Sequence, residues 1–255
     1  MTKPIGVQLY SLRTELAQDF AGTIQELAQI GYPVLEGYNG MPLGHAAIAR
    51  LIKSHGLQMP SCHLPLPFGE NERMVKQAIE QYDLQYAVLP WMSPDLFQTI
   101  DDVKRVCAQL NQARLLLESY GVSLGYHNHE FEFALVEGRS AYEIMLAELD
   151  PGIVLEVDVY WAQTAGQDPI ALVRRLGKRA PLLHLKDGPA NIAVRDAPMV
   201  PLGEGNVDVS GVVAAAGENA DFLVVELDSC ATDMMTAIRQ SYHYLTRKGL
   251  AHGNQ

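Results

Sequence analysis

The sequence predicts one (β/α)8 barrel that spans residues 1–255. Eight short apolar runs alternate with amphipathic runs, and strands that alternate with helices require right-handed crossovers and a parallel sheet. A chain of 255 residues commonly forms such a barrel as a single domain. No change of composition, Pro/Ser linker or low-complexity tract divides the chain, which disfavours two smaller domains.

The predicted strands are short apolar runs, and we expect them to follow one another around the barrel in chain order. They are Ile5–Tyr10, Val34–Glu36, Gln58–His63, Tyr86–Pro90, Val122–His127, Ile153–Asp158, Leu182–Lys186 and Phe222–Leu227.

Helical segments are predicted where apolar residues recur at three- and four-residue steps and stop before a glycine, which is typical of a helix C-cap. Three segments show this pattern: Phe20–Ile30 before Gly31, Val103–Ala113 before Gly121, and Ala237–Leu245 before Gly249.

The longest stretch without periodicity is Asp187–Val207, after the seventh strand. A loop of this length is more often functional than ornamental, so we expect it to lie over the active face. It contains Gly203-Glu204-Gly205, which does not predict a phosphate site. No helix N-terminus with a third glycine follows it, and Glu204 would repel a phosphate.

Composition limits the partners. The chain has 19 Lys+Arg against 30 Asp+Glu, a net charge of -11, which repels nucleic acid and anionic membrane surfaces. Cys62, Cys107 and Cys230 have no short spacing and support neither a disulfide framework nor a zinc finger. The sequence shows no signal-peptide core and no apolar run of membrane-spanning length. We therefore expect a cytoplasmic protein with a small-molecule substrate.

Four apolar runs within the predicted strands end in a side chain that is able to bind a metal ion: His127, Asp158, His184 and Glu226. The carboxyl ends of parallel strands meet at one edge of a barrel, so we expect these side chains to converge. Buried carboxylates are costly when unpaired, and Lys186 is the only Lys or Arg in these strand ends. The sequence thus predicts one divalent ion. Nitrogen and oxygen ligands without thiolate suit Mn²⁺, Zn²⁺, Co²⁺ or Fe²⁺.

Four further residues are candidates for binding the substrate. His129 follows His127 by two residues and faces the same way by strand period, and His63 ends the third strand. Glu36 ends the second strand, and Trp161 offers an apolar wall for a sugar ring. For each of them a structural role in the core is the alternative.

The expected chemistry follows from the ion. A metal chelated by a carbonyl oxygen and the neighbouring hydroxyl acidifies the C–H between them and stabilises an enediolate. Glu226, Glu130 and Glu132 are the candidate bases. Lys186 is predicted either to stabilise the oxyanion and help a hydroxyl leave, or to serve as the ion-pair partner of a neighbouring aspartate.

Six segments carry a resemblance to a known family. They are Gly6–Arg13, Tyr126–Phe133, Glu156–Trp161, His184–Asp187, Leu202–Gly205 and Val225–Asp228. Together they resemble the sugar isomerase/epimerase-like TIM barrels of the xylose isomerase-like superfamily, over nearly the whole chain. That superfamily includes inosose dehydratase, hydroxypyruvate isomerase, ketose 3-epimerases and AP endonucleases.

The resemblance implies a ligand set and a departure from it. In the family the ligands at the ends of strands five to eight are commonly Glu, Asp, His and Glu. Asp158, His184 and Glu226 match the last three, whereas His127 stands where the first Glu is usual. The ketose epimerases use two ligand glutamates as an acid/base pair on opposite faces of the sugar, and a neutral imidazole breaks that symmetry. Reversible epimerisation therefore loses weight against dehydration, elimination or aldose–ketose isomerisation.

Three interpretations follow. The leading one is a metal-dependent isomerase, dehydratase or lyase that acts on a keto-sugar or keto-cyclitol. The second is a phosphodiesterase like the AP endonucleases, which is opposed by the acidic charge and by the lack of the extra His and Glu ligands that a multi-metal cluster needs. The third is a non-catalytic sugar-binding barrel, which the convergence of ionisable residues disfavours. Many relatives form dimers or tetramers, so the resemblance leaves a homo-oligomer open.

Overall fold

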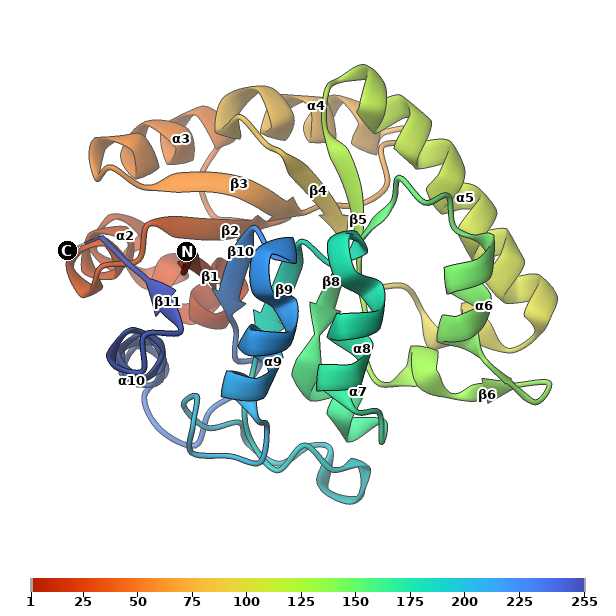
Figure 1. Cartoon of the computed structure of the whole chain (residues 1–255). Helices are drawn as coiled ribbons and strands as arrows, with labels where there is room; N and C mark the ends of the chain where they lie inside the picture. The colour runs from red at the N-terminus through yellow and green to blue at the C-terminus, as the bar shows by residue number, and fades with distance from the viewer. Residues whose placement is uncertain (1, 255) are drawn as a thin grey trace.

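The computed structural model describes residues 2–254, and within them eight parallel strands form a closed barrel (Figure 1). Each strand pairs with the next one in the ring, and β10 pairs with β1 to close it, with Ile5 opposite Leu223. The predicted fold class is therefore confirmed. The barrel strands are β1 (Lys3–Gln8), β2 (Val34–Tyr38), β3 (Gln58–His63), β4 (Tyr86–Leu89), β5 (Ser123–His127), β8 (Val154–Asp158), β9 (Leu182–Leu185) and β10 (Phe222–Val225).

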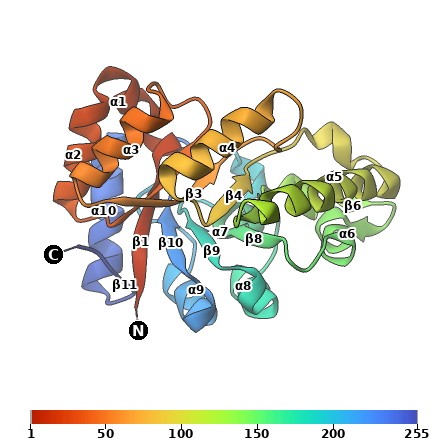
Figure 2. The ribbon, with the colours of Figure 1, turned by 90° about the horizontal axis from the view of Figure 1, so that it is seen from above.

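Helices surround the ring of strands, as Figures 1 and 2 show. They cover the outward-facing apolar residues of the strands, while the inward-facing residues fill the barrel. The helices are α1 (Arg13–Gln18), α2 (Phe20–Ile30), α3 (His45–Ser54), α4 (Asn71–Tyr82), α5 (Ile100–Ser119), α6 (Ala141–Glu148), α7 (Val159–Thr164), α8 (Pro169–Leu176), α9 (Val209–Ala216) and α10 (Met234–Arg247). None of the helices in residues 2–254 is long and apolar enough to cross a membrane.

Short elements complete the chain. A strand β11 (Ala251–His252) pairs with β1 outside the barrel, and a hairpin of β6 (Leu135–Val136) and β7 (Arg139–Ser140) follows β5. The 3-10 helices are η1 (Leu9–Leu12), η2 (Pro94–Phe97), η3 (Phe131–Phe133), η4 (Gly177–Arg179), η5 (Ile192–Val194) and η6 (Gly217–Asn219).

The predicted helix ends are confirmed by their glycines. Gly31, Gly121 and Gly249 have φ angles of 112°, 76° and 65°, the left-handed conformation that glycine adopts without a steric penalty. The amide of Gly31 donates to the carbonyls of Leu27 and Ala28, so it satisfies the last turn of α2.

The strand boundaries differ from the prediction by a few residues. β1 begins at Lys3 and ends at Gln8, because the Gln8 side chain accepts a hydrogen bond from the amide of Tyr10 and starts η1. At β9 and β10 the predicted strands overrun the observed ends, so Lys186 and Glu226 lie just beyond the sheet. Both residues therefore belong to the loops at the carboxyl end of the barrel.

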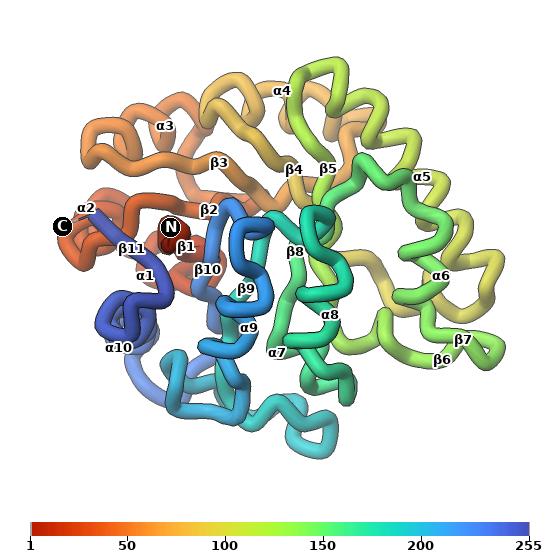
Figure 3. The backbone as a smooth tube through the Cα atoms, in the orientation of Figure 1, coloured from red at the N-terminus to blue at the C-terminus, as the bar shows by residue number. Residues whose placement is uncertain are grey.

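The barrel interior is polar toward the carboxyl ends of the strands. In β8 the outward-facing Leu155 and Val157 pack in the core, whereas Glu156 and Asp158 alternate with them and are fully buried. The loop after β9 lies at the same end of the barrel, below the strands in the view of Figure 3. This end of the barrel combines buried ionisable groups with long connections, which is where parallel α/β barrels place their sites.

Candidate functional site

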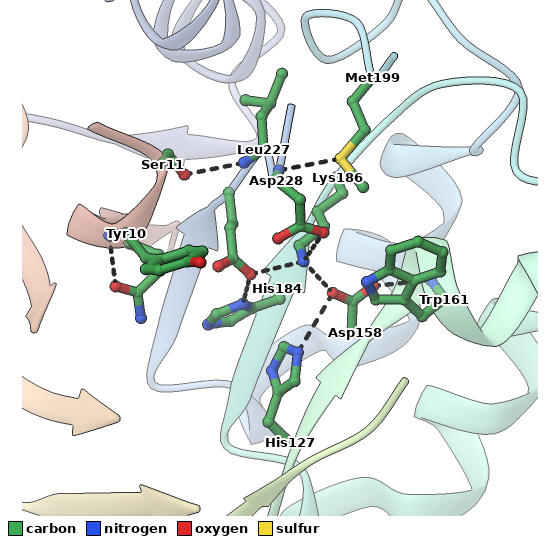
Figure 4. A network of polar contacts seen from close by, with 12 residues as sticks. Tyr10, Ser11, His127, Asp158, Trp161, His184, Lys186, Met199, Leu227 and Asp228 are labelled. Atoms are coloured by element: carbon green, nitrogen blue, oxygen red, sulfur yellow. Dashed lines mark hydrogen bonds and ion pairs between the residues drawn. The ribbon is translucent and has the colours of Figure 1, made fainter. Parts of the chain in front are cut away.

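Neighbouring strands bring the four predicted metal ligands together. Parallel pairing sets Asp158 opposite His184, and His127 ends β5 beside β8. Glu226 directly follows β10. All four side chains are buried, and each offers one ligand atom within 4.8 Å of the others. We call His127, Asp158, His184 and Glu226 the outer group, and the first three of them are labelled in Figure 4.

A second set of ligand-competent atoms lies one layer deeper in the barrel. It consists of His63, His127, Glu156 and His184, again within 4.8 Å of one another, and we call it the inner group. Glu156 Oε2 lies 2.6 Å from His63 Nε2 and 2.9 Å from His127 Nδ1. Glu156 Oε1 is buried and has no hydrogen-bond partner among the described residues. The expectation that the chain lacks extra His and Glu ligands is therefore wrong, because His63 and Glu156 lie beside the predicted ligands His127 and His184.

Glu36 lies beneath both groups and is fully buried. Its Oε2 is 2.5 Å from His184 Nε2, and its carboxylate also accepts from Gln8 Nε2 at 2.8 Å and from Ser61 Oγ at 2.5 Å. Burial and the neighbouring Glu156 raise the pKa of Glu36. This carboxylate is saturated with donors.

Lys186 supplies a positive charge to the outer group. Its Nζ lies 3.0 Å from Asp158 Oδ2, 2.8 Å from Glu226 Oε2 and 2.9 Å from Asp228 Oδ2 (Figure 4). Burial by itself lowers the pKa of Lys186, but these carboxylates outweigh it and hold the pKa well above its usual value. The ion-pair role is therefore observed. The lysine remains an ammonium at neutral pH.

The two histidines of the outer group differ in their charge. Burial lowers the pKa of His127 to about 3, so its ring is neutral. Burial also disfavours the charged form of His184, but Glu156, Glu36 and Glu226 outweigh it and raise its pKa well above the usual value. His184 Nδ1 lies 2.6 Å from Glu226 Oε2, a contact that in the absence of an ion carries a proton.

The outer group fits a divalent ion. Neutral His127 must donate its Nδ1 proton to the Glu156 carboxylate at 2.9 Å, because an ionised carboxylate only accepts. The Nε2 lone pair then faces Asp158 Oδ2 at 3.6 Å, so two acceptors meet with no proton between them. A cation between them resolves this contact, and nitrogen with carboxylate oxygen suits Mn²⁺, Zn²⁺, Co²⁺ or Fe²⁺.

A cavity of about 440 Å³ opens onto the outer group. Lys186 is the only Lys or Arg among the described residues that line it. Aromatic side chains form much of the mouth, and Tyr10 and Trp91 are 42% and 52% exposed. The lining residues are Tyr10, Tyr38, Asn39, His63, Leu64, Pro65, Leu89, Pro90, Trp91, His127, His129, Lys186, Glu226 and Asp228.

The predicted substrate-binding residues divide into two pairs. His63 and His129 line the cavity. His129 Nδ1 has no hydrogen-bond partner within residues 2–254, and burial lowers the pKa of this ring to about 2. Glu36 lies beneath the cavity, and Trp161 is 7% exposed behind His129, with 6.2 Å between the two ring centroids. The structure brings neither Glu36 nor Trp161 to the cavity wall.

The two glutamates after β5 also lie away from the cavity. The chain turns into η3 after His129, and Glu132 accepts from Tyr126 Oη and from the amide of His129, each at 2.8 Å. Glu130 forms an ion pair with Arg195 at 2.5 Å, in the loop after β9. The structure gives no support to either carboxylate as a base at the cavity.

The loop after β9 is closed at its base by Asp187. The Asp187 carboxylate is fully buried and accepts from the amides of Gly188, Gly203, Gly205 and Val207 at 2.8, 2.8, 3.1 and 3.0 Å. A side chain at Gly205 would lie 2.2 Å from Asp187 Oδ1, which explains the glycine. The Gly-Glu-Gly segment therefore binds an internal carboxylate, in agreement with the predicted absence of a phosphate cradle.

Sequence reasoning missed two kinds of residue at the site, carboxylates and aromatic side chains. Glu156 and Asp228 each lie two positions from a predicted ligand, so strand period was a signal for them. Tyr10 and Trp91 reach the cavity from the segments after β1 and β4, Tyr38 reaches it from the last position of β2, and no local pattern marks them.

The fold and the site define a (β/α)8-barrel protein with a metal-competent centre at the carboxyl ends of its strands. Residues 24–247 match the sequence profile of the xylose isomerase-like TIM barrel, and the chain belongs to this family. No curated protein matches the chain.

Solved structures show the same fold. A sugar phosphate isomerase/epimerase from Parabacteroides distasonis is 23% identical with a TM-score of 0.84, covering 98% of this chain and 100% of its own. A second protein of that description and organism is 25% identical with a TM-score of 0.83, covering 99% and 96%. The "probable 3-DHS dehydratase AsbF" from Bacillus anthracis is 12% identical with a TM-score of 0.76, covering 95% and 98%.

Proposed function

We propose that the protein is a divalent-metal-dependent isomerase, dehydratase or lyase that acts on an unphosphorylated keto-sugar or keto-cyclitol through an enediolate. The observation that carries the proposal is the outer group, whose four ligand atoms lie within 4.8 Å of one another beside a cavity of about 440 Å³. Family membership and the name of the Parabacteroides distasonis proteins support sugar isomerisation or epimerisation as the class of chemistry.

The residues have distinct roles in this proposal. His127, Asp158, His184 and Glu226 hold the ion, which when bound polarises the substrate carbonyl and acidifies the adjacent C–H. Glu226 lines the cavity, and interactions with Lys186 and His184 outweigh its burial and hold its pKa well below the usual value, so it is an available base. Lys186 also lines the cavity and donates to oxygen that gains negative charge.

The proposed direction of chemistry depends on His127. A mechanism with two ligand glutamates on opposite faces of the sugar lacks its second carboxylate here, because the β5 ligand is a neutral imidazole. Glu130 and Glu132 do not replace it, since both are engaged away from the cavity. Isomerisation, dehydration or elimination, which need one base and one acid, fit better than reversible epimerisation.

We infer that the substrate carries no phosphate from the charged side chains that line the cavity. Lys186, the single Lys or Arg of the described cavity lining, is committed to three carboxylates. A phosphate beside Asp228 and Glu226 would be repelled. Exposed Tyr10 and Trp91 instead offer aromatic faces to the apolar face of a sugar ring.

The test is NMR of candidate substrates in D₂O with protein loaded with Mn²⁺, Zn²⁺ or Co²⁺. We expect solvent deuterium at the carbon next to the carbonyl, isomerisation or dehydration, with an unphosphorylated ketose or inosose. The Asp158→Asn variant is the control and should give none. Exchange with phosphorylated sugars alone would refute the substrate class. Cleavage of abasic-site DNA without any exchange would assign the protein to the phosphodiesterases.

A further inference from the structure

The inner and outer groups share His127 and His184, but through opposite ring nitrogens. His127 presents Nε2 to Asp158 in the outer group, at 3.6 Å, and Nδ1 to Glu156 in the inner group, at 2.9 Å. His184 presents Nδ1 to Glu226 at 2.6 Å and Nε2 to Glu36 at 2.5 Å, with Glu156 at 3.2 Å. The two groups therefore compete for the same imidazoles.

A neutral imidazole has one lone pair, and its other nitrogen carries a proton. An ion in each group would require both shared rings to lose both protons, which ordinary histidine ligands do not do. Only one of the groups can therefore hold an ion while the rings stay neutral. The remaining group must provide acceptors for the two N–H bonds.

Geometry favours the ion in the outer group. The contacts of Glu156 and Glu36 with His63, His127 and His184 include distances of 2.6, 2.9 and 2.5 Å, which are hydrogen-bond lengths. Two ligand atoms about 2.1 Å from one tetrahedral ion lie more than 3 Å apart, as the 3.6 Å between His127 Nε2 and Asp158 Oδ2 allows. In the outer group the short His184–Glu226 contact relaxes when an ion replaces its proton.

We propose that Glu156 is a positioning residue for the metal site, an inference that rests on the proposed function. Its Oε2 accepts the Nδ1 proton of His127 and, together with Glu36, faces the Nε2 proton of His184. Both rings are thereby fixed in the tautomers that turn their other lone pair toward one ion in the outer group. The inner group holds protons rather than a second ion. Carboxylates in this position orient metal-bound imidazoles and raise their basicity.

The test uses Zn²⁺ as the probe and two measurements that do not depend on turnover. The first is the number of zinc ions bound per chain. The second is the two-bond ¹H–¹⁵N correlation spectrum of ¹⁵N-histidine-labelled protein, which distinguishes a protonated from a metal-bound ring nitrogen. We expect one ion, a proton on His127 Nδ1 and His184 Nε2, and metal on His127 Nε2 and His184 Nδ1. Two ions per chain, or zinc on His127 Nδ1, would overturn the inference.

Variants test the part played by Glu156. Glu156→Gln removes the charge that supports the imidazoles and should weaken zinc binding about 10–100-fold. Glu132→Gln is the matched control, because it is the same change at another fully buried glutamate, outside both groups, and should leave zinc affinity unchanged. Equal affinity of the Glu156→Gln variant and the wild type would contradict the role.

Failure of the inference about Glu156 can be distinguished from failure of the proposed function. If Glu156→Gln fails to fold, the wild-type spectrum and stoichiometry still decide the tautomers and the number of ions. Deuterium exchange with a sugar, combined with zinc on His127 Nδ1, would leave the proposed function in place and refute this inference alone. If the predicted tautomers are observed but no substrate exchanges deuterium, the role of Glu156 stands and the proposed function is refuted.

Discussion

Replacing Lys186 with methionine tests whether this ammonium is the built-in counter-charge of the outer group. Methionine keeps most of the length of the side chain but removes contacts of 3.0 Å with Asp158 and 2.8 Å with Glu226, both buried. The 2.9 Å contact with Asp228 counts for less, because that side chain is 36% exposed. Loss of one partner from a buried ion pair costs about 3–5 kcal/mol. At about 2–4 °C per kcal/mol for a chain of this size, the metal-free variant should melt about 6–20 °C below the wild type.

The assay is thermal unfolding followed by circular dichroism in the presence of a chelator. Lys104→Met is the control, an exposed lysine on α5 whose loss should change the free energy of unfolding by less than about 0.5 kcal/mol. Saturating Zn²⁺ should restore part of the lost stability, since the ion supplies positive charge to the same carboxylates. Turnover should fall while metal content stays nearly intact. A metal-free Lys186→Met variant that melts with the wild type would refute the reasoning.

Further predictions concern the ligands and the pH dependence. Asp158→Ala should abolish metal retention by dialysed protein; full retention would remove this residue from the site. His127→Ala should lose as much metal affinity as His184→Ala in a titration, because each change removes one nitrogen. Metal loss on Glu130→Ala with retention in His127→Ala would show that the β5 ligand is misassigned. Burial raises the pKa of Glu132 to about 8 from its ordinary value of 4.5, so the folded chain keeps a proton that the unfolded chain releases. The contribution of Glu132 to stability should therefore fall as pH rises from about 4.5 to 8, by at most about 5 kcal/mol, and in urea unfolding this component should be missing from the Glu132→Gln variant.

Periodicity was enough to predict the barrel, because short apolar runs alternate with amphipathic helical runs along the whole chain. The four side chains of the outer group were predictable for the same reason: strand ends meet at one edge, so His127 and Glu226 converge across 99 positions of sequence. This argument predicts the position of a side chain only where it stands at the end of an apolar run. Glu156 lies one layer below Asp158, and its contacts with three rings depend on the radius of the closed barrel.

For Glu130 and Glu132 the sequence suggested a position that the structure does not show. They lie close to His127 in sequence, which suggested a place beside the ion. Their actual positions depend on η3, which turns the chain away after His129, and on Arg195, which lies 65 residues from Glu130. Sequence proximity carries no information on such a turn. The position of Trp91 at the cavity mouth likewise depends on the path of the chain after β4, which the local sequence does not reveal.

The clamp at Asp187 makes the loop after β9 a self-contained module. Four amides from both ends of the loop converge on one buried carboxylate, so its two ends are fixed to each other as well as to the barrel. Because this clamp holds the base of the loop, substitutions between Pro189 and Pro201 should leave the backbone that carries His184 and Lys186 in place. The sequence of this loop can therefore vary while the side chains at the carboxyl ends of β8 and β9 keep their positions.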